Sequence, residues 1–125
     1  MKESIAKLHN LCEDWKRELK FFKDEVPVLR KRLDEVVSKN TSSDVLKEVE
    51  HFENKFRILS THIDELLHDV NVKTDELTSQ AATQAKYINV KMFDADTVLE
   101  DLMLTTSRDF HETKNSYYKF LSKVM

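Results

Sequence analysis

Glycine is missing from this chain, although average usage would place roughly nine glycines in a chain of this length. Phosphate-binding loops, dinucleotide-binding turns and tight β-hairpins need a residue that adopts positive φ at little cost, and glycine is that residue. Proline occurs once, at Pro27, so the chain also holds few helix breakers. These two shortages argue against glycine-loop nucleotide sites and hairpin sheets, and they predict an all-α protein.

Cysteine and long apolar runs are also scarce. Cys12 is the single cysteine, so the chain cannot form an internal disulfide, and we expect this side chain to be a small buried hydrophobe. The first ten residues hold no apolar secretory segment, and the longest apolar run, at 26–29, contains the proline. A membrane-spanning helix needs about 20 apolar residues. We therefore expect one soluble, cytoplasmic domain over residues 1–125 with no membrane partner.

Charged side chains are abundant but nearly balanced, with 20 Lys and Arg, 23 Asp and Glu, and a net charge of -3. Residues 1–40 hold ten basic and eight acidic side chains, whereas residues 41–80 hold four basic and nine acidic ones. Nucleic-acid-binding domains normally present a basic face. We therefore expect no nucleic-acid partner, and we expect the first two segments to attract each other within one bundle.

The first 40 residues carry the clearest pattern, because their apolar side chains alternate at spacings of three and four. All ten a and d positions of this heptad series, the core positions, are apolar: Ile5, Leu8, Cys12, Trp15, Leu19, Phe22, Val26, Leu29, Leu33 and Val36. A period near 3.5 residues is typical of a long helix in a left-handed bundle. Pro27 occupies an outward b position and the register continues past it, so we expect one kinked but continuous helix over about 3–39.

A polar segment at 40–44 separates this helix from a second one. Its Asn, Thr, Ser and Asp side chains are typical of turns and helix N-caps. A second heptad series then runs from 45 to 77, and Lys73 is the one polar residue among its ten core positions. This series predicts a helix over about 43–79 that returns antiparallel to the first.

A third heptad series runs from 92 to 124 and is the least apolar. Asp96, Thr106 and Thr113 are polar residues at its core positions, which begin at Met92. The series predicts a helix over about 92–123, with a connection somewhere in 80–91. Three helices of similar length and short connections predict an antiparallel up-down-up three-helix bundle with coiled-coil-like heptad packing.

The acidic and histidine side chains of the second helix offer the only pattern suggestive of a metal. Glu-x-x-His pairs at 48–51 and 65–68 have the spacing of di-iron bundles, but their heptad positions point away from the core. His62, Glu65 and Asp69 share one helical face and form a weak candidate metal site if a second helix adds ligands. We expect no cofactor, and a metal- or small-ligand-binding bundle is the alternative hypothesis.

Paired catalytic groups and phosphate loops are missing, so we expect no enzymatic activity. Phe21 and Val28 lie at outward c positions one heptad apart, beside Pro27, and a basic cluster follows them. An apolar strip on a helix can dock a partner helix. We take Phe21, Val28, Arg30 and Lys31 as candidate partner-binding residues. The leading hypothesis is a non-enzymatic interaction or scaffold module that binds another protein or a second copy of itself.

A family resemblance is carried by the runs WKREL at 15–19, FKDE at 22–25 and RLDEVVSKN at 32–40. Segments at 50–56, 63–70 and 120–123 follow the same pattern. Together they resemble a family of small uncharacterised bacterial helical proteins. The resemblance implies a helical bundle and no established activity, so it assigns no functional residue. The architecture, with Trp15 in the first helix, is more distantly similar to a spectrin-type repeat, and this likeness concerns the fold alone.

Overall fold

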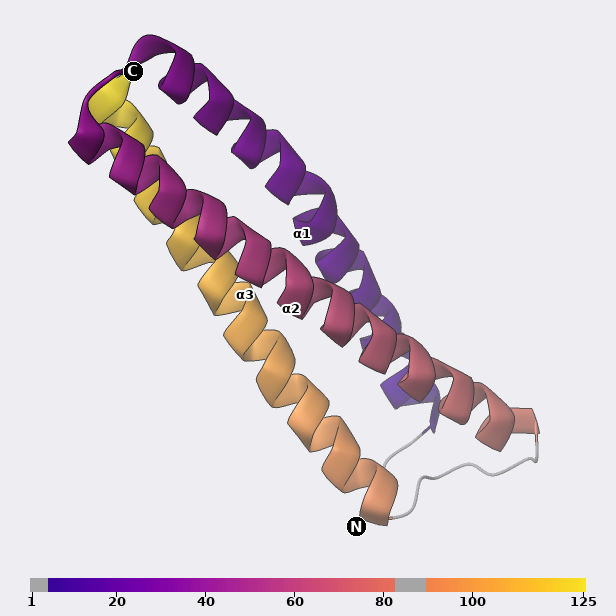
Figure 1. Cartoon of the computed structure of the whole chain (residues 1–125). Coiled ribbons are helices and arrows are strands. Elements are labelled where there is room, and N and C mark those ends of the chain that lie inside the picture. Colours follow the sequence, from indigo (N-terminus) through magenta and orange to yellow (C-terminus); the bar gives the residue numbers. More distant parts are fainter. Residues whose placement is uncertain (1–4, 83–89) are drawn as a thin grey trace.

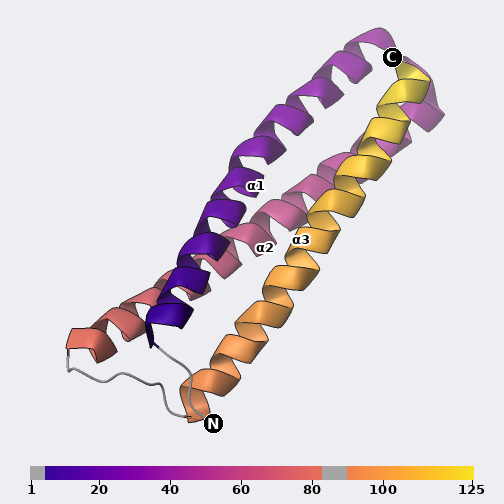
Figure 2. The same cartoon turned by 180° about the vertical axis from the view of Figure 1, so that it is seen from behind.

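The chain folds into three long helices. The computed structural model describes residues 5–82 and 90–125, and the side chains of residues 5–80 and 98–125. The helices are α1 (Ile5–Lys39), α2 (Ser43–Ala82) and α3 (Val90–Val124), and the described residues contain no strand. α1 and α3 run in one direction and α2 runs in the other (Figures 1 and 2). The prediction of an all-α, up-down-up three-helix bundle is confirmed.

The helix boundaries lie close to the predicted ones. α1 ends at Lys39 and continues as a helix through Pro27. α2 extends to Ala82 rather than ending at 79, and α3 begins at Val90 rather than at 92. The remainder of the connection expected in 80–91 lies outside the described residues, and so do the side chains at 92 and 96.

The short connection between α1 and α2 is held by local hydrogen bonds. The Asn40 side-chain amide donates to the carbonyl oxygen of Val36 at 3.0 Å, which satisfies one of the acceptors left open at the end of α1. The backbone amide of Leu46 donates to the carbonyl oxygen of Ser42 at 3.0 Å, so the α2 ladder starts from that residue. The polar segment therefore forms the predicted connection between the two helices, and its Asn40 caps the end of α1.

The core consists of the predicted heptad positions. All ten core positions of α1 are buried. On α2 and α3, the predicted positions with described side chains are also buried, except Val45 and Val124 at the helix ends, which are half-buried. Lys73, Thr106 and Thr113 are buried although they are polar. The register inferred from the sequence is therefore the register of the fold.

Aromatic rings join the helices along the core. Phe22 of α1 stacks on Phe110 of α3, with ring centroids 4.2 Å apart. Tyr117 of α3 packs edge-on against Phe56 of α2 at 5.1 Å and against Phe52 at 5.3 Å. Such pairs add to the free energy gained from burying the rings. The aromatic contacts therefore connect α3 to both other helices.

α1 packs closely on α2, whereas its backbone approaches α3 at few points. Polar side chains span this wider interface. Ser107 Oγ donates to Glu18 at 3.0 Å, and Lys114 pairs with Glu25. The hydrogen bond to the Glu25 carboxylate raises the pKa of Lys114. Both contacts join residues 89 positions apart, so they fix the parallel register of α1 and α3.

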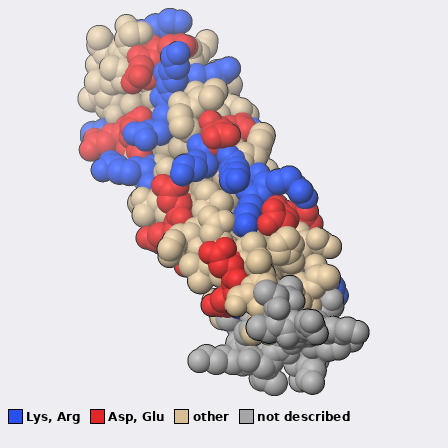
Figure 3. Space-filling view, turned by 90° about the vertical axis from the view of Figure 1, so that its right-hand side faces the viewer, with Lys and Arg blue, Asp and Glu red and all other residues tan. Residues whose placement is uncertain are grey.

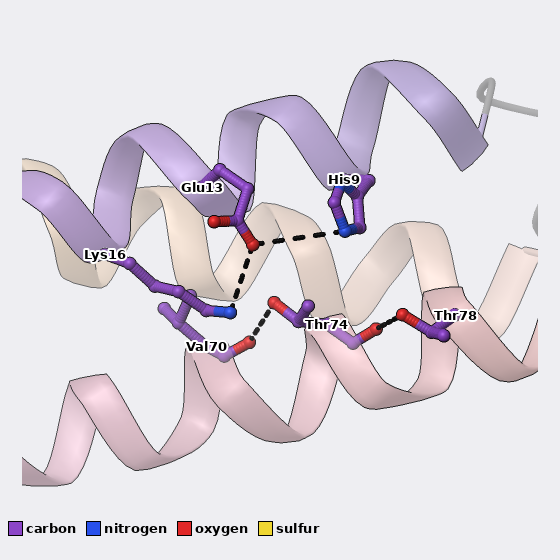
Figure 4. A network of polar contacts seen from close by, with 6 residues as sticks. All are labelled: His9, Glu13, Lys16, Val70, Thr74 and Thr78. Carbon is purple, nitrogen blue, oxygen red and sulfur yellow. Dashed lines mark hydrogen bonds and ion pairs between the residues drawn. The ribbon is translucent and has the colours of Figure 1, made fainter.

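Polar groups near the start of α1 find their partners within their own helix (Figure 4). Lys16 Nζ donates to Glu13 at 3.1 Å, and this hydrogen bond lowers the pKa of the Glu13 carboxyl. On α2, the Thr74 hydroxyl donates to a carbonyl one turn back at 3.0 Å, and the Thr78 hydroxyl does the same at 2.9 Å. Back-bonding of this kind satisfies a hydroxyl without a cross-helix partner.

We expect Trp15→Ala to lower the free energy of unfolding by roughly 3–5 kcal/mol, because it removes a large core aromatic. The Trp15 side chain is only 8% exposed. Urea denaturation followed by circular dichroism measures the change. Asp14→Ala, at the neighbouring exposed position, is the control and should change stability little. A loss below about 1 kcal/mol for Trp15→Ala would contradict the assigned core.

Tyr117→Phe should cost about 1 kcal/mol at neutral pH, because it removes a buried hydrogen bond. The Tyr117 hydroxyl donates to the carbonyl oxygen of Leu29 at 2.6 Å, and burial raises its pKa to about 12. The unfolded chain ionises this group near pH 10, so native stability should fall as pH rises from about 10 to 12. Urea titrations across that range should show a flatter fall for Tyr117→Phe than for the exposed control Tyr118→Phe. Equal pH dependence in the two variants would contradict this assignment.

Candidate functional site

A continuous groove runs between α2 and α3. Three neighbouring hollows of about 430, 290 and 1120 Å³ lie there. His62 and Asp109 line both the first and the second hollow, and Asp69 and Leu102 line both the second and the third. The three hollows therefore form one surface feature, which we call the α2–α3 groove.

The heptad positions of the lining residues show which side of the bundle the groove occupies. All lining residues come from α2 and α3, and all but His68 and Asp75 lie at c, d or g positions. The residues of α2 that pair with α1, Glu53 and Asp64, lie at e and b positions. The groove therefore opens on the side of α2 away from α1. On α2 it extends from residue 51 to residue 80, which corresponds to about 44 Å of helix.

The polar core positions form part of the groove floor. Thr113, Thr106 and Lys73 occupy d positions and line the first, second and third hollow respectively. A threonine fills less space than the leucine usual at such a position, so the two helices leave room between them. These three are the polar core positions whose side chains the structure describes, and all three therefore line the same groove.

Apolar side chains line the groove without being covered by the fold. Ile58 and Val98 are 57% and 58% exposed, and Val72 and Leu102 are also exposed. Each of the four lines at least one of the hollows. Exposed apolar side chains gathered along a groove and flanked by polar residues are typical of an interaction site.

The groove is acidic. Six carboxylates line it, together with two lysines and three histidines: Glu65, Asp69, Asp75, Glu76, Asp109, Glu112, Lys55, Lys73, His51, His62 and His68. Lys73 is buried, and its ammonium lies 3.2 Å from the Glu76 carboxylate. Carboxylates on both sides of a concave surface reinforce one another's negative potential.

The four candidate partner-binding residues differ in their surroundings. Phe21 and Val28 are 56% and 64% exposed, as their c positions predict. Arg30 instead lies at an e position and pairs with Glu53 of α2 at 2.9 Å. Arg30 and Lys31 line a separate hollow of about 580 Å³ between α1 and α2, and neither Phe21 nor Val28 lines it.

Figure 3 views the molecule from the side that carries α1 and the last turns of α2. Lys and Arg side chains gather across the middle of this face, with Asp and Glu between them. The face therefore carries charges of both signs, in contrast to the acidic α2–α3 groove. Phe21 and Val28 remain two exposed apolar residues on a mixed-charge helix.

The candidate metal residues lie inside the groove. His62, Glu65 and Asp69 line its middle hollow, and Asp109 faces them from α3. Within residues 5–80 and 98–125, however, no three His, Cys, Asp or Glu side chains converge closely enough to hold a metal ion. The shared face therefore places these residues together along a wall of the groove and not around a common point.

Sequence reasoning missed the apolar residues of the groove. Ile58, Val72 and Val98 lie at c positions, and Leu102 lies at a g position. The available signal was the combination of apolar c positions on α2 and α3 with polar d positions on the same helices. The heptad pattern was clearest in α1, and it therefore pointed to the c positions of that helix, Phe21 and Val28, as the binding residues.

We expect Thr106→Val to raise the free energy of unfolding by about 1 kcal/mol, because it removes a buried hydroxyl that lacks a hydrogen-bond partner among the described residues. Thr74→Val is the matched control: it should destabilise the protein, because the Thr74 hydroxyl is bonded to the Val70 carbonyl. Thermal and urea unfolding of both variants measure the difference. A destabilised Thr106→Val protein would show that this hydroxyl does have a structural role.

No described helix combines the length and apolarity that a membrane crossing requires. Comparisons with protein-family models, with curated proteins and with solved structures give no match to this chain. The resemblance to a bacterial helical family therefore stays an expectation, and the site rests on its own geometry.

Proposed function

We propose that this protein is a non-enzymatic interaction module that binds a helix of a partner protein in the α2–α3 groove. The observation that carries this proposal is the groove itself: about 44 Å of helix with exposed apolar side chains along it. This is the function expected from the sequence, with the binding surface moved from α1 to α2 and α3.

A helix is the ligand that fits this shape. The groove lies between two antiparallel helices, and its lining repeats every three to four residues, so a third helix can place its own apolar residues between theirs. The complex would then resemble a four-helix bundle, with Ile58, Val72, Val98 and Leu102 covered. The described residues include no strand, and hence no sheet edge, for an extended peptide to join.

The packing of the monomer favours this surface over the others. The ten core positions of α1 are buried against the rest of the chain, so they are not available to a partner. Arg30 is engaged by Glu53 of α2, and Phe21 and Val28 are the two exposed apolar residues of the candidate surface on α1. The α2–α3 groove, by contrast, has four exposed apolar side chains distributed along its length.

Site-specific photo-crosslinking in the native host tests the proposal. The photoreactive residue p-benzoyl-phenylalanine replaces Leu102 in the groove, Phe21 on α1, or Glu35 as an exposed control. We expect one protein to crosslink to position 102 in near-stoichiometric amounts, and we expect Ile58→Asp in the same chain to abolish this product. Val28→Asp, which makes the same kind of change on α1, should leave the product unchanged.

Each alternative result has a definite meaning. A product at position 21 but not at 102 would show that α1 carries the interaction and that the groove does not. If the chain with Ile58→Asp still forms the product at position 102, the partner lies near the groove but does not bind in it. The absence of any product at all three positions would overturn the function as an interaction module.

A further inference from the structure

The charges of the α2–α3 groove identify the class of its partner. We infer that the bound helix is basic, with an apolar stripe flanked by Lys and Arg side chains. This inference rests on the proposed function and adds the chemistry of the ligand. It concerns a segment of another protein, and a second copy of this chain is one of the outcomes that the test separates.

The first supporting observation is that the groove carboxylates are not neutralised within the fold. Among the described residues, only Glu76 of the six has an ion pair, with Lys73. Glu65, Asp69, Asp75, Asp109 and Glu112 have no ion pair or hydrogen bond to any described side chain. On the surfaces that face another helix of the bundle, Glu25, Glu53 and Asp64 each pair with a Lys or Arg.

This contrast separates two kinds of carboxylate. Those at the contacts of α1 with the other helices are compensated by the fold, whereas five of the six groove carboxylates have no ion pair among the described residues. A ligand with cationic side chains can pair with these carboxylates, and it is also drawn toward the groove during diffusional encounter. An acidic helix would meet uncompensated like charge along both walls.

The second supporting observation comes from the groove floor. Thr106 and Thr113 are 8% and 9% exposed, and they line the middle and first hollows. Neither hydroxyl has a hydrogen-bond partner among the residues that the structure describes, whereas the buried Thr74 hydroxyl is bonded within its helix. Buried hydroxyls without partners are uncommon in folded proteins. A bound helix with Lys or Arg side chains beside its apolar stripe brings hydrogen-bond donors to these hydroxyls.

The same charges argue against a second copy of the chain as the occupant. In a symmetric dimer that joins two grooves, the walls of one groove would meet the walls of the other. Such a contact would place Glu65 and Asp69 of one copy near carboxylates of the next. Like charges brought together at an interface strongly disfavour association. A basic helix from a different protein satisfies both the apolar and the charged parts of the groove.

Three synthetic peptides of about 28 residues, the length of the groove, test the inference. The first has a leucine stripe at a and d positions with Lys on both flanks. The second has Glu in place of every Lys, and the third has the composition of the first in an order that destroys the stripe. Binding of each fluorescently labelled peptide to the full chain is measured by anisotropy. We expect the Lys peptide to bind at least 10-fold more tightly than either other peptide, with the advantage over the Glu peptide shrinking as salt is added.

Matched charge variants locate the binding. Glu65→Gln, Asp69→Asn and Glu112→Gln combined neutralise three exposed groove carboxylates, and we expect them to weaken the Lys peptide roughly 10-fold. The control combines Asp14→Asn, Asp24→Asn and Glu35→Gln on α1, which changes the net charge equally. Circular dichroism establishes that both proteins remain helical.

The outcomes separate this inference from the function on which it rests. If the Glu peptide binds as tightly as the Lys peptide, the basic partner is excluded while the helix-binding function stands. If the scrambled peptide binds equally, or if the α1 control weakens binding as much as the groove variant, the attraction is non-specific and the inference fails. If no peptide binds, or if the chain alone has a mass above 14.8 kDa that Leu102→Asp restores to the monomer, the groove does not serve a foreign helix.

Discussion

The structure depends on one side chain that reaches all three helices. Tyr117 projects from α3, packs its ring between Phe52 and Phe56 of α2, and donates its hydroxyl to the Leu29 carbonyl of α1. α1 and α2 are already tightly paired, whereas α3 approaches α1 at few backbone positions. Specific side-chain contacts therefore help to set the position of α3, and Tyr117 contacts both other helices.

This arrangement explains why one face of the bundle is closed and another is open. On its side toward α1, α3 carries Ser107 and Lys114, whose hydrogen bonds to α1 span the wider of the two interfaces. Phe110 also stacks on Phe22 of α1. Against α2, Tyr117 and Phe120 pack on the phenylalanine rings, while Thr106 and Thr113 line the groove on the outer side. The same helix thus uses a positions for cohesion and d positions for the groove.

Heptad analysis of the sequence predicted most of the fold and little of the site. The core positions of α1 and the cap at 40–44 were predictable, because both depend on local side-chain chemistry and on a regular period. The heptad series also located His62, Glu65 and Asp69 on one face, but it did not show that α3 would lie opposite them. That depends on how α3 is rotated about its axis, which the contacts of Tyr117 and Phe110 decide. The strip at Phe21 and Val28 was correctly placed on the surface, yet a surface position alone does not make a binding site.

The threonines of the groove floor bear on how stable the protein is in a cell when no partner is bound. A core that is incomplete at Thr106 and Thr113 makes the free protein less stable than its helices would otherwise allow. A ligand that binds only the folded state adds to stability by mass action. The amount of this protein that survives cellular proteolysis would then rise and fall with the supply of its partner. Under the proposed function, the supply of the partner would thus set the amount of this protein without any separate regulatory device.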